Sequence, residues 1–144
     1  MAYGGLTVGA LDGLDAVVFF GLRGVPAPRI FQAIASGLLG RAAFQGGLAT
    51  VALGVALHFF IAFTVVVTFY AASRRLPALT RRPLVWGPLY GIAVYLVMNL
   101  IVLPLSAAAH GMPSPPVLVN GVLIHMFGVG LPSALFARAA SPIS

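Results

Sequence analysis

The chain's only acidic residues are Asp12 and Asp15, and both lie inside an apolar stretch near the N-terminus. On the membrane-insertion scale, each Asp near the centre of a spanning helix costs about 2.5 to 3.5 kcal/mol. A spacing of three residues places both carboxyl groups on one face of a helix. We therefore predict an ion or proton site. The alternatives are a structural pair satisfied by His or Asn, and an Asp that lies nearer the lipid headgroups.

Three further polar residues, His58, Asn99 and His125, interrupt the other apolar stretches. Small residues at four-residue spacing mark the packed faces of membrane helices, and each of the three polar residues continues such a stripe. Counted from the expected helix ends at about 1.5 Å per residue, these residues and the two aspartates fall in the middle third of the bilayer. The glycines that we assign to helix packing are Gly5, Gly9, Gly13, Gly54, Gly87, Gly91 and Gly121.

A carboxylate and an imidazole held together in such a place can take up and release a proton near neutral pH. His58 and His125 have two other readings: hydrogen bonding between helices, or axial ligation of a haem b or another metal from two different helices. Asn99 is more typical of a residue that joins helices than of a ligand. The chain has no cysteine, which excludes thiolate ligands and nucleophiles. No serine combines with a His and an acid into a triad, so an enzyme is not favoured.

The composition indicates the kind of structure that positions these side chains. Of 144 residues, 60% are hydrophobic and 7% are charged, whereas a soluble domain has roughly a quarter charged. We expect an all-α membrane protein with one transmembrane domain over residues 1–144. Four stretches reach the roughly 20 residues that a spanning helix needs. They are residues 4–22, 47–72, 84–108 and 116–137.

The segment between the first two helices is too polar to span the membrane and too apolar for an ordinary loop. Ile30, Ile34 and Leu38 repeat at four-residue spacing, which predicts a short interfacial or re-entrant helix at about 30–45. A helix packed as a cap over the end of the bundle is the alternative. Pro104 and Pro132 are expected to kink the third and fourth helices.

The charge pattern predicts the orientation. Short loops rich in Arg stay on the cytoplasmic side, and the loop between the second and third helices carries Arg74, Arg75, Arg81 and Arg82. Both termini are then cytoplasmic, and these arginines contact lipid headgroups. Arg23, Arg29 and Arg41 fall on the outer side, against this rule. Because the arginines lie in short loops between apolar runs, the net charge of +6 does not indicate a nucleic-acid partner.

Four strings spread over most of the chain resemble a group of small, four-helix inner-membrane proteins of bacteria. The strings are SGLLG at 36–40, LHFFIA at 57–62, YGIAVYLVMN at 90–99 and HMFGVGLP at 125–132. The resemblance implies an integral protein of the bacterial inner membrane, and it assigns no role to any residue.

We interpret the chain as a small transporter or channel component that handles a proton, a cation or a small polar solute at its midplane cluster. That cluster comprises Asp12, Asp15, His58, Asn99 and His125. Four helices enclose little space, so we expect a homo-oligomer or a partner in a membrane complex, with the glycine stripe of the first helix as a contact. The alternatives are a haem- or metal-binding redox protein and an accessory subunit without chemistry.

Overall fold

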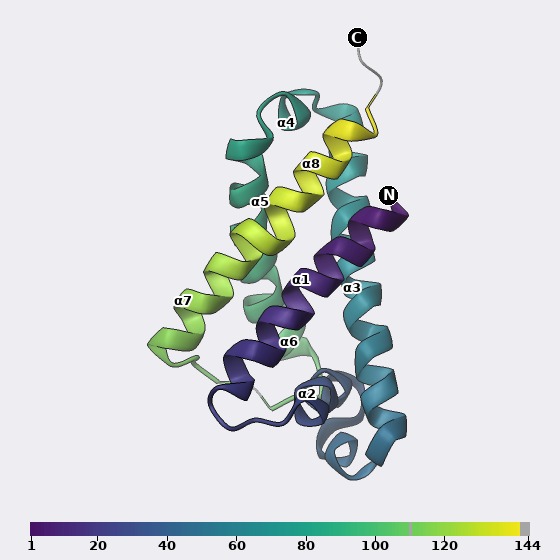
Figure 1. The fold of residues 1–144 in the computed structure, drawn as a ribbon, viewed down its shortest axis with the longest axis vertical. Coiled ribbons are helices and arrows are strands. Elements are labelled where there is room, and N and C mark those ends of the chain that lie inside the picture. The colour runs from purple at the N-terminus through teal and green to yellow at the C-terminus, as the bar shows by residue number, and fades with distance from the viewer. Residues whose placement is uncertain (110, 142–144) are drawn as a thin grey trace.

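The computed structural model describes residues 1–109 and 111–141, and over this part of the chain every regular element is helical (Figure 1). The predicted domain also includes residues 110 and 142–144, which lie outside the described residues. The α-helices are α1 (Ala2–Gly21), α2 (Ala27–Leu39), α3 (Gly47–Arg75), α4 (Ala78–Arg81), α5 (Pro83–Val97), α6 (Leu103–Leu105), α7 (Pro115–Ile124) and α8 (Leu131–Ala139).

Four helical stretches of the described chain are long and apolar enough to cross a membrane, which confirms the predicted all-α bundle. They are Ala2–Gly21, Gly47–Arg75, Pro83–Leu105 and Pro115–Ala139. The third ends before the predicted residue 108 because the backbone of Ser106 is extended. Figure 1 shows the start of α1, α4 and the end of α8 at one end of the bundle, and α2 at the opposite end.

The third and fourth spans each contain a π-helical segment that ends two residues before a proline. These segments are η2 (Met98–Val102), before Pro104, and η3 (His125–Gly130), before Pro132. Proline has no N–H to donate to the carbonyl four residues back, so the regular hydrogen-bond ladder cannot continue through it. Instead, the N–H groups of Leu103 and Leu131 donate to the carbonyls five residues back, those of Met98 and Met126.

The segment between the first two spans forms α2 and a 3₁₀ helix, η1 (Gly40–Gln45), and Figure 1 shows it at the end of the bundle opposite α4. The Gln32 side chain donates from Nε2 to the Gly47 carbonyl at 3.3 Å, and Thr50 Oγ1 donates to the Ala43 carbonyl at 2.6 Å. The Ala107 N–H donates to the Gly37 carbonyl at 2.9 Å. These bonds tie α2 to α3 and to the chain after α6, so α2 caps the bundle.

All seven glycines assigned to packing contact another part of the structure. Gly5, Gly9 and Gly13 are buried, and a Cβ atom added to them would meet Phe63, Phe59 and His58 of α3. The expectation that this stripe contacts a second copy of the chain is therefore wrong, because α3 already covers it. The remaining four approach these groups: Gly54 the Phe31 backbone, Gly87 Leu131, Gly91 the His125 and Met126 backbone, and Gly121 the Tyr95 ring.

Replacement of Gly91 by Ala tests this packing. The new Cβ would lie 2.7 Å from Met126 Cα and against the His125 carbonyl, so α5 and η3 must separate. We expect Gly91→Ala to lower the free energy of unfolding in detergent by about 2 kcal/mol. Gly21→Ala is the matched control, because a Cβ at the end of α1 meets nothing within 4 Å. Equal stability of the two variants would contradict the close approach.

Candidate functional site

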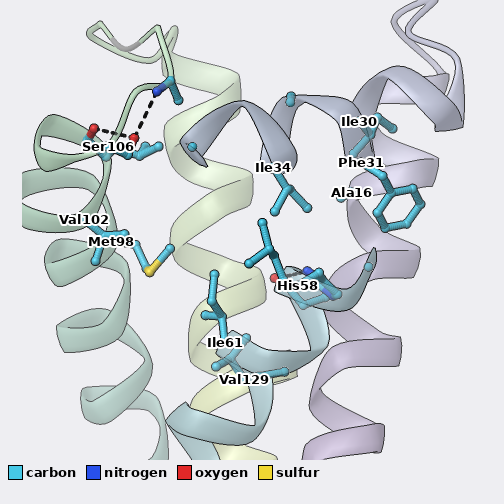
Figure 2. A pocket seen from close by; sticks show the side chains of 18 of the residues that line it. Ala16, Ile30, Phe31, Ile34, His58, Ile61, Met98, Val102, Ser106 and Val129 are labelled. Carbon is cyan, nitrogen blue, oxygen red and sulfur yellow. Dashed lines mark hydrogen bonds and ion pairs between the residues drawn. The ribbon is translucent and has the colours of Figure 1, made fainter. Parts of the chain in front are cut away.

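A cavity of about 580 Å³ lies among α1, α2, α3, α5 and the two π-helical segments. Most of its lining is aliphatic or aromatic, and Figure 2 shows Ile34, Ile61 and Met98 pointing into it from different elements, next to His58. Four of the five predicted site residues also line this cavity: Asp12, His58, Asn99 and His125. The structure therefore brings together one acid, two imidazoles and one amide on the walls of one largely apolar cavity.

His58 joins α3 to α1. Its Nε2 atom lies 2.8 Å from the Gly9 carbonyl oxygen; since a carbonyl only accepts, Nε2 carries the proton and donates. In the neutral ring Nδ1 is then an unprotonated acceptor, and it lies 3.9 Å from Asp12 Oδ2. The rings of Phe31 and Phe59 approach the imidazole at 6.3 and 5.5 Å between centroids, which fixes its orientation.

His125 has the opposite arrangement. Its Nδ1 atom lies 2.8 Å from the Gly121 carbonyl, one turn back, so Nδ1 donates and the Nε2 of the neutral ring keeps a free lone pair. The Tyr95 ring contacts the imidazole edge-on at 5.3 Å between centroids. The two histidines therefore present different nitrogens as acceptors.

The Asp12 carboxyl accepts no hydrogen bond from any described residue, although its side chain is only 27% exposed. It interacts electrostatically with His125 and His58. A carboxylate without a hydrogen-bonded partner in a low-dielectric setting requires a proton or a counter-charge. Asp12 is therefore the group in this cavity whose charge is not already satisfied.

Asp15, one turn further along α1, faces a different neighbour and does not line the cavity. Asn120 of α7 donates from Nδ2 to Asp15 Oδ2 at 2.7 Å. The two aspartates, predicted to act together, therefore have different surroundings: Asp15 accepts a hydrogen bond, whereas Asp12 has the His58 ring nitrogen at 3.9 Å. Sequence reasoning missed Asn120, although an Asn within an apolar span was a usable signal.

Asn99 lies in η2 and donates from Nδ2 to the Tyr95 carbonyl of its own helix at 2.9 Å. It does not join two helices, as one reading of the sequence had it. Its amide oxygen accepts no hydrogen bond from the described residues. Because Asn99 lines the cavity, this oxygen is a further hydrogen-bond acceptor there.

A haem held by both histidines does not fit these bonds. Haem ligands usually coordinate through Nε2 while Nδ1–H is hydrogen-bonded to a carbonyl. His125 has this arrangement, but the Nε2 of His58 is occupied by the Gly9 carbonyl. Within residues 1–109 and 111–141, no group of three or more His, Cys, Asp or Glu side chains is placed to hold a metal ion.

Apolar packing closes the cavity toward the α4 end. A buried cluster lies on the α4 side of Asp12 and His58, made by Val8, Ala62, Val66 and Val129. A second cluster follows, made by Phe69, Ala134 and Ala137 with Tyr90 beside them. At the other end, Arg29 and Ser106 lie on the cavity rim. In this conformation the polar groups are thus separated from the α4 end by two apolar layers.

Comparison with protein-family models, with curated proteins and with solved structures finds no match to this chain. The resemblance to small bacterial inner-membrane proteins stays a prediction.

The two imidazole tautomers can be measured directly. With both rings neutral, we expect ¹⁵N spectra to show His58 protonated at Nε2 and His125 protonated at Nδ1, because each proton is held by a backbone carbonyl. His58→Gln and His125→Gln assign the signals. A single common tautomer would contradict the site as described.

The pairing of Asp15 with Asn120 predicts an energetic coupling. A double-mutant cycle of Asp15→Ala and Asn120→Ala should give a coupling free energy of about 1 kcal/mol, which is typical of hydrogen bonds between membrane helices. The control cycle combines Asp12→Ala with Asn120→Ala and should give a value near zero. A coupling at Asp12 as large as that at Asp15 would show that the two acids share one environment.

Proposed function

We propose that the protein is a small proton-coupled transporter of the bacterial inner membrane and that Asp12 is the group that takes up and releases the proton. The observation that carries this proposal is the Asp12 carboxyl, which faces a cavity inside a membrane bundle without a hydrogen-bonded partner. Intramembrane acids of this kind mark ion and proton pathways.

The two histidines support the same role. The lone pairs of His58 Nδ1 and His125 Nε2 are free in the neutral rings. Each ring can accept a proton without giving up its bond to a backbone carbonyl. The cavity thus has three neighbouring groups that can bind a proton, whereas Asp15, which is bound to Asn120, has a structural role.

The apolar layers between the cavity and the α4 end favour a gated site over an open channel. A continuous pore would need water or polar groups along its length, and the clusters around Val66 and Phe69 have neither buried charge nor an amide. Transport then requires a second arrangement in which these layers part. A second copy is not needed to line the cavity, since one chain supplies its walls; a homo-oligomer or complex partner stays a prediction.

The orientation rests on the arginines. Five of the eight arginines in the chain lie in or next to α4, at the end of α3 or at the end of α8, which share one end of the bundle: Arg74, Arg75, Arg81, Arg82 and Arg138. This excess supports a cytoplasmic location for the α4 end and for both termini. The same arginines are exposed and are positioned to contact anionic lipid headgroups.

Proton flux into proteoliposomes tests the proposal. With a pH gradient imposed and the membrane potential clamped, we expect Asp12→Asn to lower the flux by at least about tenfold, as loss of a positioned proton-transfer group does. Asp15→Asn is the matched control: it keeps an amide able to bond to Asn120 and should retain the flux. Unaltered flux and pH dependence in Asp12→Asn would overturn the assignment.

A further inference from the structure

Four polar residues of the cavity each have an acceptor atom without a hydrogen-bond donor when both imidazoles are neutral, whereas the donors Arg29 and Ser106 lie toward the α2 end. Asp12 contributes a carboxylate, and His58 and His125 contribute unprotonated ring nitrogens. The Asn99 amide oxygen is a fourth acceptor. A ligand that complements this set carries a positive charge, donates hydrogen bonds, or does both.

The apolar part of the cavity lining indicates the polarity and size of the ligand. Its walls are mostly aliphatic, with the rings of Phe20 and Phe31 among them, and aromatic faces attract cations. A volume of about 580 Å³ lies in the range of sites for small organic molecules. A hydrated inorganic cation would make no apolar contact with these walls. The complementary ligand is therefore an organic cation with a large apolar body.

A groove of about 350 Å³ between α3 and α5 adjoins the cavity. Five residues line both spaces: Ile61, Val65, Val94, Met98 and Val102. Its outer members Phe60 and Val97 are exposed by 69% and 46%, on helices that span the membrane. The groove therefore lies between the lipid-facing surface and the cavity, with these five side chains at the boundary of the two spaces. A cation that came instead from the α2 end would pass the exposed Arg29 on the rim, which repels it.

We propose that the cavity binds a lipophilic organic cation that enters from the bilayer through the groove between α3 and α5 and pairs with Asp12. Protonated Asp12 releases its proton to water as the cation binds to the carboxylate, so the charge of the site is conserved. This substrate class rests on the proposed function, because one carboxyl serves the proton and the cation in turn. The other charged or titratable groups that face Asp12 are His58, His125, Asp15 and, at the rim, Arg29.

Binding of tetraphenylphosphonium to the purified full-length protein in detergent tests this. The isosteric anion tetraphenylborate is the control for apolar partition. We expect the cation to bind with release of about one proton, and its affinity to fall about tenfold per pH unit once Asp12 is protonated. Tetraphenylborate should bind at least tenfold more weakly. This test needs only the wild-type protein. Equal binding of both probes, or binding of the cation without proton release, would overturn the proposal.

Two pairs of variants locate the site and the route. Asp12→Asn should abolish the preference for the cation and the proton release, whereas Asp15→Asn should keep both. Val97→Trp fills the groove and should slow association several-fold; Val119→Trp, on the exposed side of α7, should not. Loss of cation preference in both Asp variants, or equal rates in both Trp variants, counts against the inference.

The two proposals can fail separately. If the proton flux depends on Asp12 but tetraphenylphosphonium does not bind, the proposal of an organic cation is excluded and the proposal of a proton-coupled transporter stands. Binding that depends on Asp12 without proton flux supports the site for the cation and removes the proposed transport.

Discussion

The hydrogen bond from His58 Nε2 to the Gly9 carbonyl is the interaction on which the site depends. At 2.8 Å it joins α3 to α1, and it decides which ring nitrogen is left to face Asp12. It forms because α1 presents glycines to α3: a Cβ at Gly13 would lie 3.1 Å from the same Nε2 atom. Close helix packing and the chemical state of the imidazole therefore have one cause.

This constraint also explains how the bundle tolerates an acid at membrane depth. An isolated carboxylate there is expensive, and His58 and His125 offset part of that cost only when an imidazole is protonated. Asp15 is stabilised differently, through the Asn120 amide on α7. One acid accepts a permanent hydrogen bond, whereas the other faces groups that can gain or lose a proton. Only the second kind of environment allows the charge of the site to change during function.

The sequence predicted the spans well because lipid requires long apolar helices, and the structure changes their limits by only a few residues. It also identified four cavity residues, since a buried polar residue on a small-residue stripe has few places to point. It did not separate Asp12 from Asp15, because a shared helix face does not determine which neighbour each side chain meets. The partner Asn120 and the tautomers depend on distances between helices, which residue spacing does not contain. The packing role expected for Gly5, Gly9 and Gly13 is confirmed, but the partner expected for this stripe was wrong for the same reason: a pattern shows that a face is packed but not against what.

The π-helical segments place the polar residues in a particular way. Each holds one more residue per turn than the surrounding α-helix, so the side chains before and after it are out of phase by about 100° relative to a continuous α-helix. α7 can thus direct Asn120 and Gly121 toward one set of neighbours while α8 directs Ser133 and Ala134 toward another. Asn99 and His125 lie inside these segments. A single span therefore behaves as two half-helices with independent faces, which allows a chain of four spans to meet more packing requirements than four uninterrupted cylinders would.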